Sequence, residues 1–191
     1  MSPLTNIATM LTWLRIAAIP LIAFVFYLPV PWAHPAAAVI FIAAAITDGL
    51  DGYLARRLDL TSEFGAFLDP VADKLMVVTA LILILQADPR LSVAAITAII
   101  IGREVMVSAL REWMAEVGNR EQVAVTGVAK IKTIAQMFGL SLMLWTQDLF
   151  GMPVYAIGVG LMIIAAGLTL WSMVIYIRAA WPYLAGEQEL P

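Results

Sequence analysis

The chain has 191 residues, of which 62% are hydrophobic and 13% are charged, and its mean hydropathy of +0.92 lies outside the range of soluble globular domains. We therefore expect a protein embedded in a lipid bilayer. The lack of cysteine excludes disulfides and thiolate metal sites, so any metal needs oxygen ligands or the single His34. The net charge of -3, without a long basic run, argues against a nucleic-acid partner.

Six segments are apolar over the roughly 20 residues that a helix needs to cross a bilayer. Prolines, glycine or short charged connectors separate them. A cleaved signal peptide is disfavoured, because no basic residue precedes Arg15. We predict an all-α polytopic membrane protein that forms one domain over residues 1–191 and ends in a short exposed tail from Ala179 to Pro191. The predicted transmembrane helices are residues 11–30, 35–57, 66–86, 92–115, 124–147 and 153–178.

The distribution of basic residues predicts the orientation in the membrane. With six transmembrane helices, both termini lie on the same side. Lys and Arg accumulate on the cytoplasmic side, and the loops predicted for the opposite side contain only Arg90 of the 11 Lys and Arg residues. Both termini are therefore predicted to be cytoplasmic. His34 lies in one of the outer turns, where we interpret it as an interfacial residue rather than a metal ligand.

Two of the predicted helices carry charges within apolar sequence. Asp48 and Asp51 lie in the second helix, and Asp69 and Asp73 lie in the third. Four unpartnered aspartates at such positions would cost on the order of 10 kcal/mol. Their spacings, i to i+3 and i to i+4, place each pair on one helix face. Because the connector 58–65 is short, the two helices should be antiparallel neighbours whose carboxylates meet near one end of the bundle.

Four clustered carboxylates repel one another or take up protons unless cations lie among them. Hard divalent cations prefer carboxylate oxygen, and Mg²⁺ is commonly held by a few carboxylates together with substrate phosphates. The pattern therefore predicts two metal ions about 4 Å apart that bridge a phosphoryl group. Two other interpretations stay open: ion pairs between these aspartates and Arg56 or Lys74 that hold the helices together, and a pathway for protons or cations.

The four aspartates belong to a longer pattern of eight fixed residues within 26 positions. It resembles the signature of the CDP-alcohol phosphatidyltransferase family at every defined position. The resemblance implies a six-helix membrane fold, usually a homodimer, in which the aspartates bind two divalent cations, Mg²⁺ or Mn²⁺. It also implies that Asp73 is the catalytic base and that an alcohol hydroxyl displaces CMP from a CDP-linked lipid. The implied CDP-lipid-binding residues are Gly52, Ala55, Arg56 and Gly65, with Thr12 from the first helix.

Basic residues later in the chain point to the second substrate. Arg103 and Arg111 are eight residues apart and lie on roughly one helix face, and Lys130 and Lys132 follow in the next helix. Their segments resemble those of family members whose acceptor is sn-glycerol 3-phosphate, which Arg and Lys hold by charge-assisted hydrogen bonds. Glu104 is not expected to pair with Arg103, because adjacent helical side chains diverge. A simpler interpretation also stays open, in which these cations only enforce topology or bind anionic headgroups.

The resemblance as a whole implies transfer of the phosphatidyl group from CDP-diacylglycerol to sn-glycerol 3-phosphate at the cytoplasmic side of a bacterial inner membrane. Acyl chains would enter from the bilayer, and the polar substrates and metal from the cytoplasm. Within the family, the alternative is another acceptor, such as inositol phosphate, serine or phosphatidylglycerol. From a different class, the alternative is a metal or proton transporter, although ion conduction would not require the fixed glycine, alanine and arginine positions.

Overall fold

The computed structural model describes residues 7–58, 63–116 and 127–184, and it places the side chains of residues 12–47, 68–116 and 132–183. The described residues form six α-helices and no β-strand, so the predicted all-α class is confirmed. One isolated β-bridge joins Leu149 to Met152 in the last turn. The helices are α1 (Ile7–Phe26), α2 (Ala33–Leu58), α3 (Glu63–Ala87), α4 (Leu91–Glu116), α5 (Gly127–Trp145) and α6 (Val154–Leu184).

The helices coincide with the predicted apolar segments and differ from them mainly at their ends. α1 ends at Phe26, four residues before the predicted end at residue 30. The turn that follows contains Pro29 and Pro31, and proline disfavours the helical conformation of the residue before it. The prolines therefore end the helix earlier than its apolar composition alone suggested.

The end of α6 corrects the prediction of an exposed tail. The helix continues to Leu184 rather than stopping at residue 178. Ala180 is completely buried, and Tyr183 packs against a small apolar cluster that also contains Met114 of α4. Ala180 and Tyr183 are therefore part of the packed bundle, because their side chains join a cluster with residues of α4. Trp181 between them is exposed.

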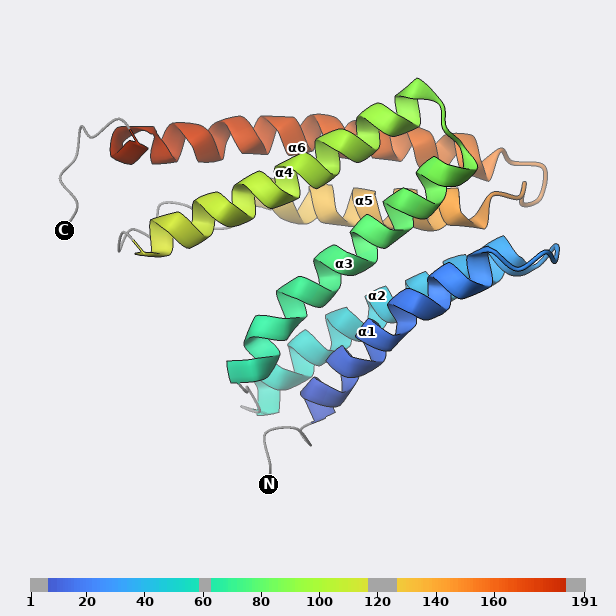
Figure 1. The fold of residues 1–191 in the computed structure, drawn as a ribbon, viewed down its shortest axis with the longest axis horizontal. Helices are drawn as coiled ribbons and strands as arrows, with labels where there is room; N and C mark the ends of the chain where they lie inside the picture. Colours follow the sequence, from blue (N-terminus) through green and yellow to red (C-terminus); the bar gives the residue numbers. More distant parts are fainter. Residues whose placement is uncertain (1–6, 59–62, 117–126, 185–191) are drawn as a thin grey trace.

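α5 and α6 run along the long dimension of the molecule, whereas α1, α2 and α3 run obliquely to it (Figure 1). α1 packs on α2, and α5 packs on α6, while contact between α2 and α5 joins these two pairs. α3 lies against α1 and α5, and α4 lies against α3 and α6. The turns α1–α2, α3–α4 and α5–α6 lie toward the right of Figure 1, whereas α1 begins at the bottom and α6 ends at the left. The three turns thus lie on one side of the molecule, and the first turn of α1 and the last turn of α6 both lie away from them.

The main apolar core lies toward the end that holds these turns. It joins the C-terminal halves of α1, α3 and α5 to the N-terminal halves of α2, α4 and α6. Fully buried members include Phe41, Ile84, Ile100 and Leu140. Buried charged side chains, Arg15, Arg103 and Lys132, lie toward the opposite end, together with the buried hydroxyl of Thr12. The sequence therefore divides the bundle into an apolar half and a polar half, and the polar half contains the candidate site.

Two glycines allow α5 and α6 to approach closely. A methyl group added at Gly139 would lie 2.8 Å from Cγ of Met162, and one added at Gly158 would lie 2.8 Å from Cγ of Met143. Each glycine thus receives the methionine of the opposite helix. This reciprocal packing makes α5 and α6 a rigid pair.

By length and composition, α4 and α6 are suited to cross a bilayer, over Leu91–Glu116 and Val154–Tyr183. Shorter apolar stretches occur at Thr12–Phe26 and Ala33–Thr47. These helices support a membrane protein, and the further predicted transmembrane helices stay a prediction.

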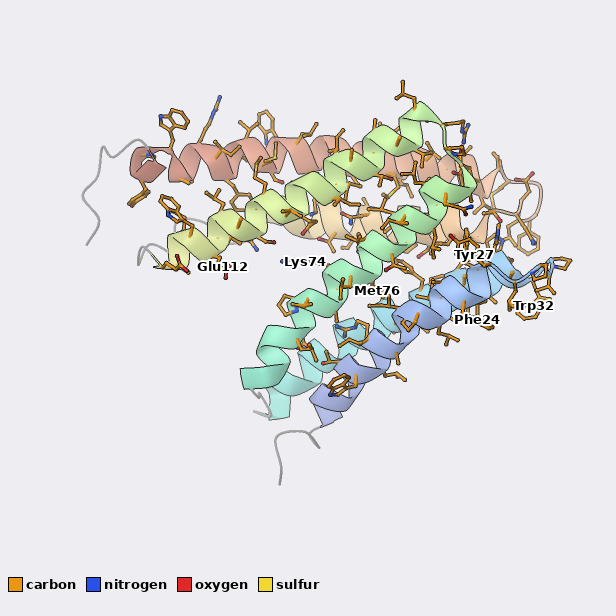
Figure 2. The ribbon with its side chains drawn as sticks, viewed as in Figure 1. Phe24, Tyr27, Trp32, Lys74, Met76 and Glu112 are labelled. Carbon is orange, nitrogen blue, oxygen red and sulfur yellow. The ribbon has the colours of Figure 1, made fainter. Side chains whose placement is uncertain are left out.

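The turns at the apolar end carry a separate set of polar contacts. His34 Nδ1 lies 2.9 Å from Thr146 Oγ1, and the imidazole stacks on the ring of Phe26 at 4.4 Å. Arg90 donates to both carboxylate oxygens of Asp88, at 2.8 Å from Nε and 2.6 Å from Nη2. These contacts tie the loops together at the end remote from the aspartate motif. Figure 2 shows Tyr27 and Trp32 at the same end.

Candidate active site

The first part of the site is a polar contact between α1 and α3. Thr12 donates from Oγ1 to Oδ1 of Asp69 at 2.5 Å, and Arg15 donates from Nη1 to Oδ1 of Asp73 at 2.9 Å. Thr12 and Arg15 are three residues apart and the aspartates four apart, so matching helix faces meet. The Arg15 side chain is fully buried, whereas that of Asp73 is 45% exposed. Side chains of α1 therefore hydrogen-bond to both carboxylates, while the Asp73 side chain stays accessible.

The other half of the aspartate motif lies in α2. Asp48 and Asp51 belong to the last three turns of this helix, but their side chains lie outside the described residues. Only four residues separate the end of α2 from the start of α3, and the two helices run in opposite senses (Figure 1). The opposite senses of the two helices are thus confirmed. Their direct packing is not among the main helix contacts of the described residues, so the expected meeting of their carboxylate faces stays a prediction. The side chains of the other motif residues in α2 and α3 also lie outside the described residues; these are Gly52, Ala55, Arg56 and Gly65.

Asp69 and Asp73 are suitable ligands for the expected cations. They present carboxylate oxygens one helical turn apart on α3, and carboxylate oxygen is the donor that Mg²⁺ and Mn²⁺ prefer. No group of three or more metal-binding side chains occurs among the residues whose side chains are placed. The predicted four-aspartate group includes two members beyond that part of the chain, so the two-metal arrangement stays a prediction.

Lys74 connects the acidic helix to α4. Its ammonium group donates to Oγ of Ser108 at 2.6 Å, and Ser108 in turn donates to the backbone carbonyl of Glu104 at 2.6 Å. Figure 2 shows the Lys74 side chain leaving α3 on the side of α4. Lys74 therefore turns away from its neighbour Asp73, as expected from its position on the helix, and links the aspartates to the second part of the site.

The second part of the site is a buried basic cluster between α4, α5 and α6. One carboxylate oxygen of Glu104 lies 2.7 Å from Arg103 Nη1 and 3.1 Å from Lys132 Nζ. The expectation that Glu104 would not pair with Arg103 is therefore wrong. Although adjacent Cβ atoms diverge, both side chains are long enough for their charged ends to meet, and Lys132 of α5 contacts the same carboxylate oxygen.

Arg111 joins this cluster through α6. Its Nη2 donates to the hydroxyl of Tyr176 at 2.8 Å. The same ring lies 5.1 Å from Cζ of Arg111 and 5.8 Å from Cζ of Arg103, while Arg103 Nη2 donates to Oγ of Ser172 at 3.3 Å. The structure thus brings Arg103, Arg111 and Lys132 together. Lys130 lies in the first turn of α5, and its side chain lies outside the described residues.

Three residues of this region were not predicted as site residues. A signal existed for Arg15, because an arginine within an apolar helix requires an anionic partner, and the nearby helices offered aspartates. No comparable signal existed for Tyr176 and Ser172. Both look like ordinary residues of an apolar helix until the packing of α6 on α4 is known.

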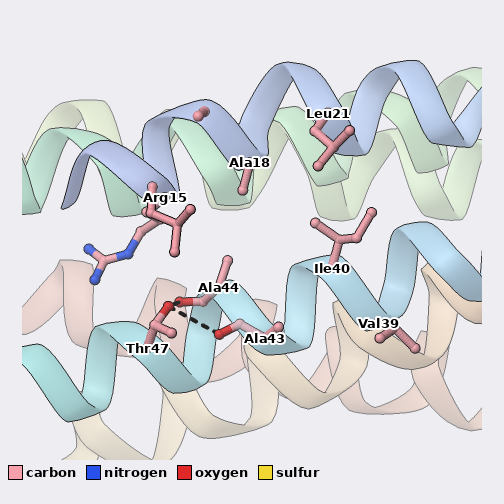
Figure 3. A pocket seen from close by; sticks show the side chains of 10 residues that line it. Arg15, Ala18, Leu21, Val39, Ile40, Ala43, Ala44 and Thr47 are labelled. Carbon is pink, nitrogen blue, oxygen red and sulfur yellow. Dashed lines mark hydrogen bonds between the residues drawn. The ribbon is translucent and has the colours of Figure 1, made fainter. Parts of the chain in front are cut away.

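A groove between α1 and α2 lies next to the acidic part of the site. It encloses about 320 Å³ and is lined almost entirely by apolar side chains, among them Leu21 and Ile40. Arg15 and Thr47 lie at one end of the groove, and Leu21 and Val39 at the other (Figure 3). The groove therefore runs from the polar half of the bundle into the apolar half.

The apolar helices indicate a membrane protein, and within the bundle carboxylates lie beside a buried basic cluster. The model of the CDP-alcohol phosphatidyltransferase family matches residues 5–171, and the chain belongs to this family. The resemblance seen in the sequence is thus confirmed, and the chain is an enzyme of the phosphatidyltransferase class.

Curated relatives cover nearly the whole chain. A CDP-diacylglycerol–glycerol-3-phosphate 3-phosphatidyltransferase of Pseudomonas fluorescens is 51% identical over 188 residues, which span 97% of this chain and 96% of the relative. A protein of the same name from Escherichia coli (strain K12) is 49% identical over 175 residues, spanning 92% and 94%. The relative from Shigella flexneri serotype 5b has the same name, identity and coverage.

Proposed function

We propose that the protein transfers the phosphatidyl group of CDP-diacylglycerol to sn-glycerol 3-phosphate, giving phosphatidylglycerophosphate and CMP. The observation that carries the choice of acceptor is the charge of the basic cluster. Arg103 and Lys132 pair with the carboxylate of Glu104, and Arg111 donates to the hydroxyl of Tyr176, so these four charged side chains together carry two positive charges in excess. A phosphate monoester carries about two negative charges at neutral pH. An acceptor with such a phosphate would neutralise the cluster. The names of the relatives, which include glycerol-3-phosphate, support the same acceptor.

The aspartates carry the chemistry in this proposal. A hydroxyl oxygen of the acceptor attacks the phosphorus that bears the diacylglycerol, and the bond from this phosphorus to the oxygen of CMP breaks. The hydroxyl proton passes to the carboxylate of Asp73, which Arg15 holds in position. Asp48, Asp51, Asp69 and Asp73 would hold two Mg²⁺ or Mn²⁺ ions. When bound, these ions neutralise the diphosphate and the charge that develops on the departing CMP.

The groove between α1 and α2 is the proposed place for an acyl chain of the donor. Its exposed wall includes Leu14, Leu21 and Val39, which are 60%, 47% and 54% exposed, so a lipid could enter it sideways from the bilayer. Its polar end lies at Arg15, close to the aspartates. The diphosphate would then reach the metal ions, with Gly52, Ala55, Arg56, Gly65 and Thr12 completing the CDP-lipid site. Thr12 already supports this geometry by its hydrogen bond to Asp69.

The proposed setting is the bacterial inner membrane. One domain over residues 1–191 would cross it six times, with both termini and the polar half of the bundle on the cytoplasmic side. The first turn of α1 and the last turn of α6 both lie away from the three turns that join the helices, which supports this topology (Figure 1). We also propose a homodimer, as the family resemblance implies.

A CMP-release assay tests the function. Purified protein in detergent micelles with CDP-diacylglycerol and Mg²⁺ should release CMP with sn-glycerol 3-phosphate, and much less with glycerol, serine, inositol phosphate or phosphatidylglycerol. Glycerol is the matched control, because it lacks only the phosphate. Preference for another acceptor would reject the acceptor assignment. Metal or proton flux into liposomes without CMP release would instead support the transporter alternative.

A further inference from the structure

Tyr176 on α6 contacts two of the three cations of the basic cluster. Its hydroxyl accepts a hydrogen bond from Arg111 Nη2 at 2.8 Å, and its ring lies within 5.8 Å of the guanidinium carbons of both Arg111 and Arg103. The tyrosine is 3% exposed, so its ring has little room to move. A single buried side chain thus contacts two arginines that lie about two turns apart on α4.

The two arginines need such support, because like charges that share one buried region repel each other. The electron-rich face of the ring attracts guanidinium groups, and its hydroxyl oxygen accepts a charged donor. Within the described residues, Nε of Arg103 and Nε of Arg111 are buried and donate no hydrogen bond. Buried donors of this kind usually have a partner, and an anion bound between the arginines would supply one.

We infer that Tyr176 is a positioning residue that holds Arg111 and Arg103 ready to receive the phosphate of the acceptor. Ser172, one turn earlier on α6, supports Arg103 by its hydrogen bond. The inference rests on the proposed function, since it assigns these arginines to sn-glycerol 3-phosphate. It also extends the site to α6, at a position beyond residue 171, where the match to the family model ends.

Steady-state kinetics of Tyr176→Phe test this role. The substitution keeps the ring and removes only the hydroxyl that contacts Arg111. We expect the KM for sn-glycerol 3-phosphate to rise about fivefold to tenfold, while the KM for CDP-diacylglycerol and kcat change less than about twofold. Tyr176→Leu also removes the ring and should raise the KM for the acceptor about fivefold further. A fall in kcat or a rise in both KM values for Tyr176→Phe would indicate only a structural role and would reject the inference.

Tyr183→Phe is the matched control. Tyr183 lies on the same helix and packs against the same small apolar cluster, but no described contact joins it to either arginine. Its substitution should leave both KM values unchanged. An equal rise in the KM for the acceptor in both phenylalanine variants would contradict a specific role of Tyr176.

A double-mutant cycle identifies the residue through which Tyr176 acts. In an Arg111→Ala background, Tyr176→Phe should raise the KM for the acceptor less than about twofold, because the hydroxyl no longer has its donor. Full additivity would overturn the inference. If the wild-type protein releases no CMP with sn-glycerol 3-phosphate, then the proposed function itself has failed. If the wild-type protein is active but Tyr176→Phe leaves the KM unaltered, only the role of Tyr176 is rejected.

Discussion

The polar half of the bundle contains two regions that hold their charges in different ways. In the contact between α1 and α3, the buried Arg15 supports Asp73, whose side chain is 45% exposed. In the basic cluster, the side chains of Arg103 and Lys132 are both 6% exposed, and Glu104 between them is 22% exposed. The carboxylate of Asp73 in the acidic region is thus partly exposed, whereas the charged side chains of the basic cluster are mostly buried.

This difference suits two kinds of binding. An accessible carboxylate pair can exchange water for metal ions and a diphosphate, and its occupancy should depend on the ions in solution. A buried cluster of cations around a rigid tyrosine is preorganised, so its effect should appear as affinity for one substrate. The hydrogen bond from Lys74 to Ser108 joins the two regions. Removing the metal ions or an aspartate should therefore lower the rate of turnover. Removing an Arg or Lys side chain of the basic cluster should instead raise the KM for the acceptor.

The largest effect is expected from removal of the metal ions. Excess EDTA should abolish CMP release, and addition of Mg²⁺ or Mn²⁺ should restore it, because carboxylates and a diphosphate repel each other without cations. The rate of CMP release before and after metal addition is the measurement. Full turnover in excess EDTA would contradict the two-metal proposal.

The second effect concerns Asp73. Asp73→Asn keeps the shape of the side chain and one oxygen but removes its basicity. We expect CMP release to fall by roughly 10² to 10⁴-fold, the usual contribution of a general base, while CDP-diacylglycerol still binds. Excess metal should not restore the activity of this variant.

Asp48→Asn and Asp51→Asn provide the comparison for Asp73→Asn. As ligands without a role in proton transfer, these residues should mainly raise the metal concentration that is needed for activity. If added metal fully restores Asp73→Asn, then Asp73 is only a ligand and the base lies elsewhere. Metal titrations of the three variants side by side decide between these roles.

The shared helix face of Asp69 and Asp73 could be predicted from the sequence. Aspartates within apolar helices are costly, so their spacing alone indicates a shared face and a cationic partner. The same reasoning did not lead to Arg15 as the partner of Asp73, because the pairing depends on the rotation of α1 against α3. Helix rotation is set by packing, which an apolar segment does not specify.

The basic cluster was predicted less completely, for two physical reasons. The pairing of Arg103 with Glu104 depends on flexible side chains rather than on helix geometry. Tyr176 belongs to an apolar helix in which tyrosine is an ordinary residue. Its role arises only from the contact between α6 and α4, two helices that are distant in sequence.

The third prediction tests the assignment of the cations. Arg111→Ala and Lys130→Ala should each raise the KM for sn-glycerol 3-phosphate by about tenfold or more, with a smaller change in kcat, because a phosphate contact stabilises ground and transition states alike. Arg178→Ala is the matched control, since Arg178 is an exposed arginine of α6, near Tyr176 in sequence. Unchanged KM in both test variants, with intact protein, would favour a role in topology alone.

The smallest effect is expected at the opposite end of the bundle, where Asp88 and Arg90 form a carboxylate–guanidinium pair outside the helices. Hydrogen bonds from Arg90 lower the pKa of Asp88 from 3.8 to about 2, and the hydroxyl of Tyr155 contributes to the same shift. Because the pKa is lower in the folded protein, the pair stabilises the fold above about pH 4, and this contribution is lost as the pH falls from about 4 to about 2.

Asp88→Asn should therefore lower the Tm at pH 7 by only a small amount, since exposed ion pairs contribute little. The difference in Tm between the variant and the wild type should shrink as the pH approaches 2. Both KM values and kcat should stay unchanged, because this pair lies far from the polar half of the bundle. Thermal unfolding across this pH range, together with the CMP-release assay, provides the measurement. A large change in kcat would mean that the two ends of the bundle are coupled, and the separation between its apolar and polar halves would have to be abandoned.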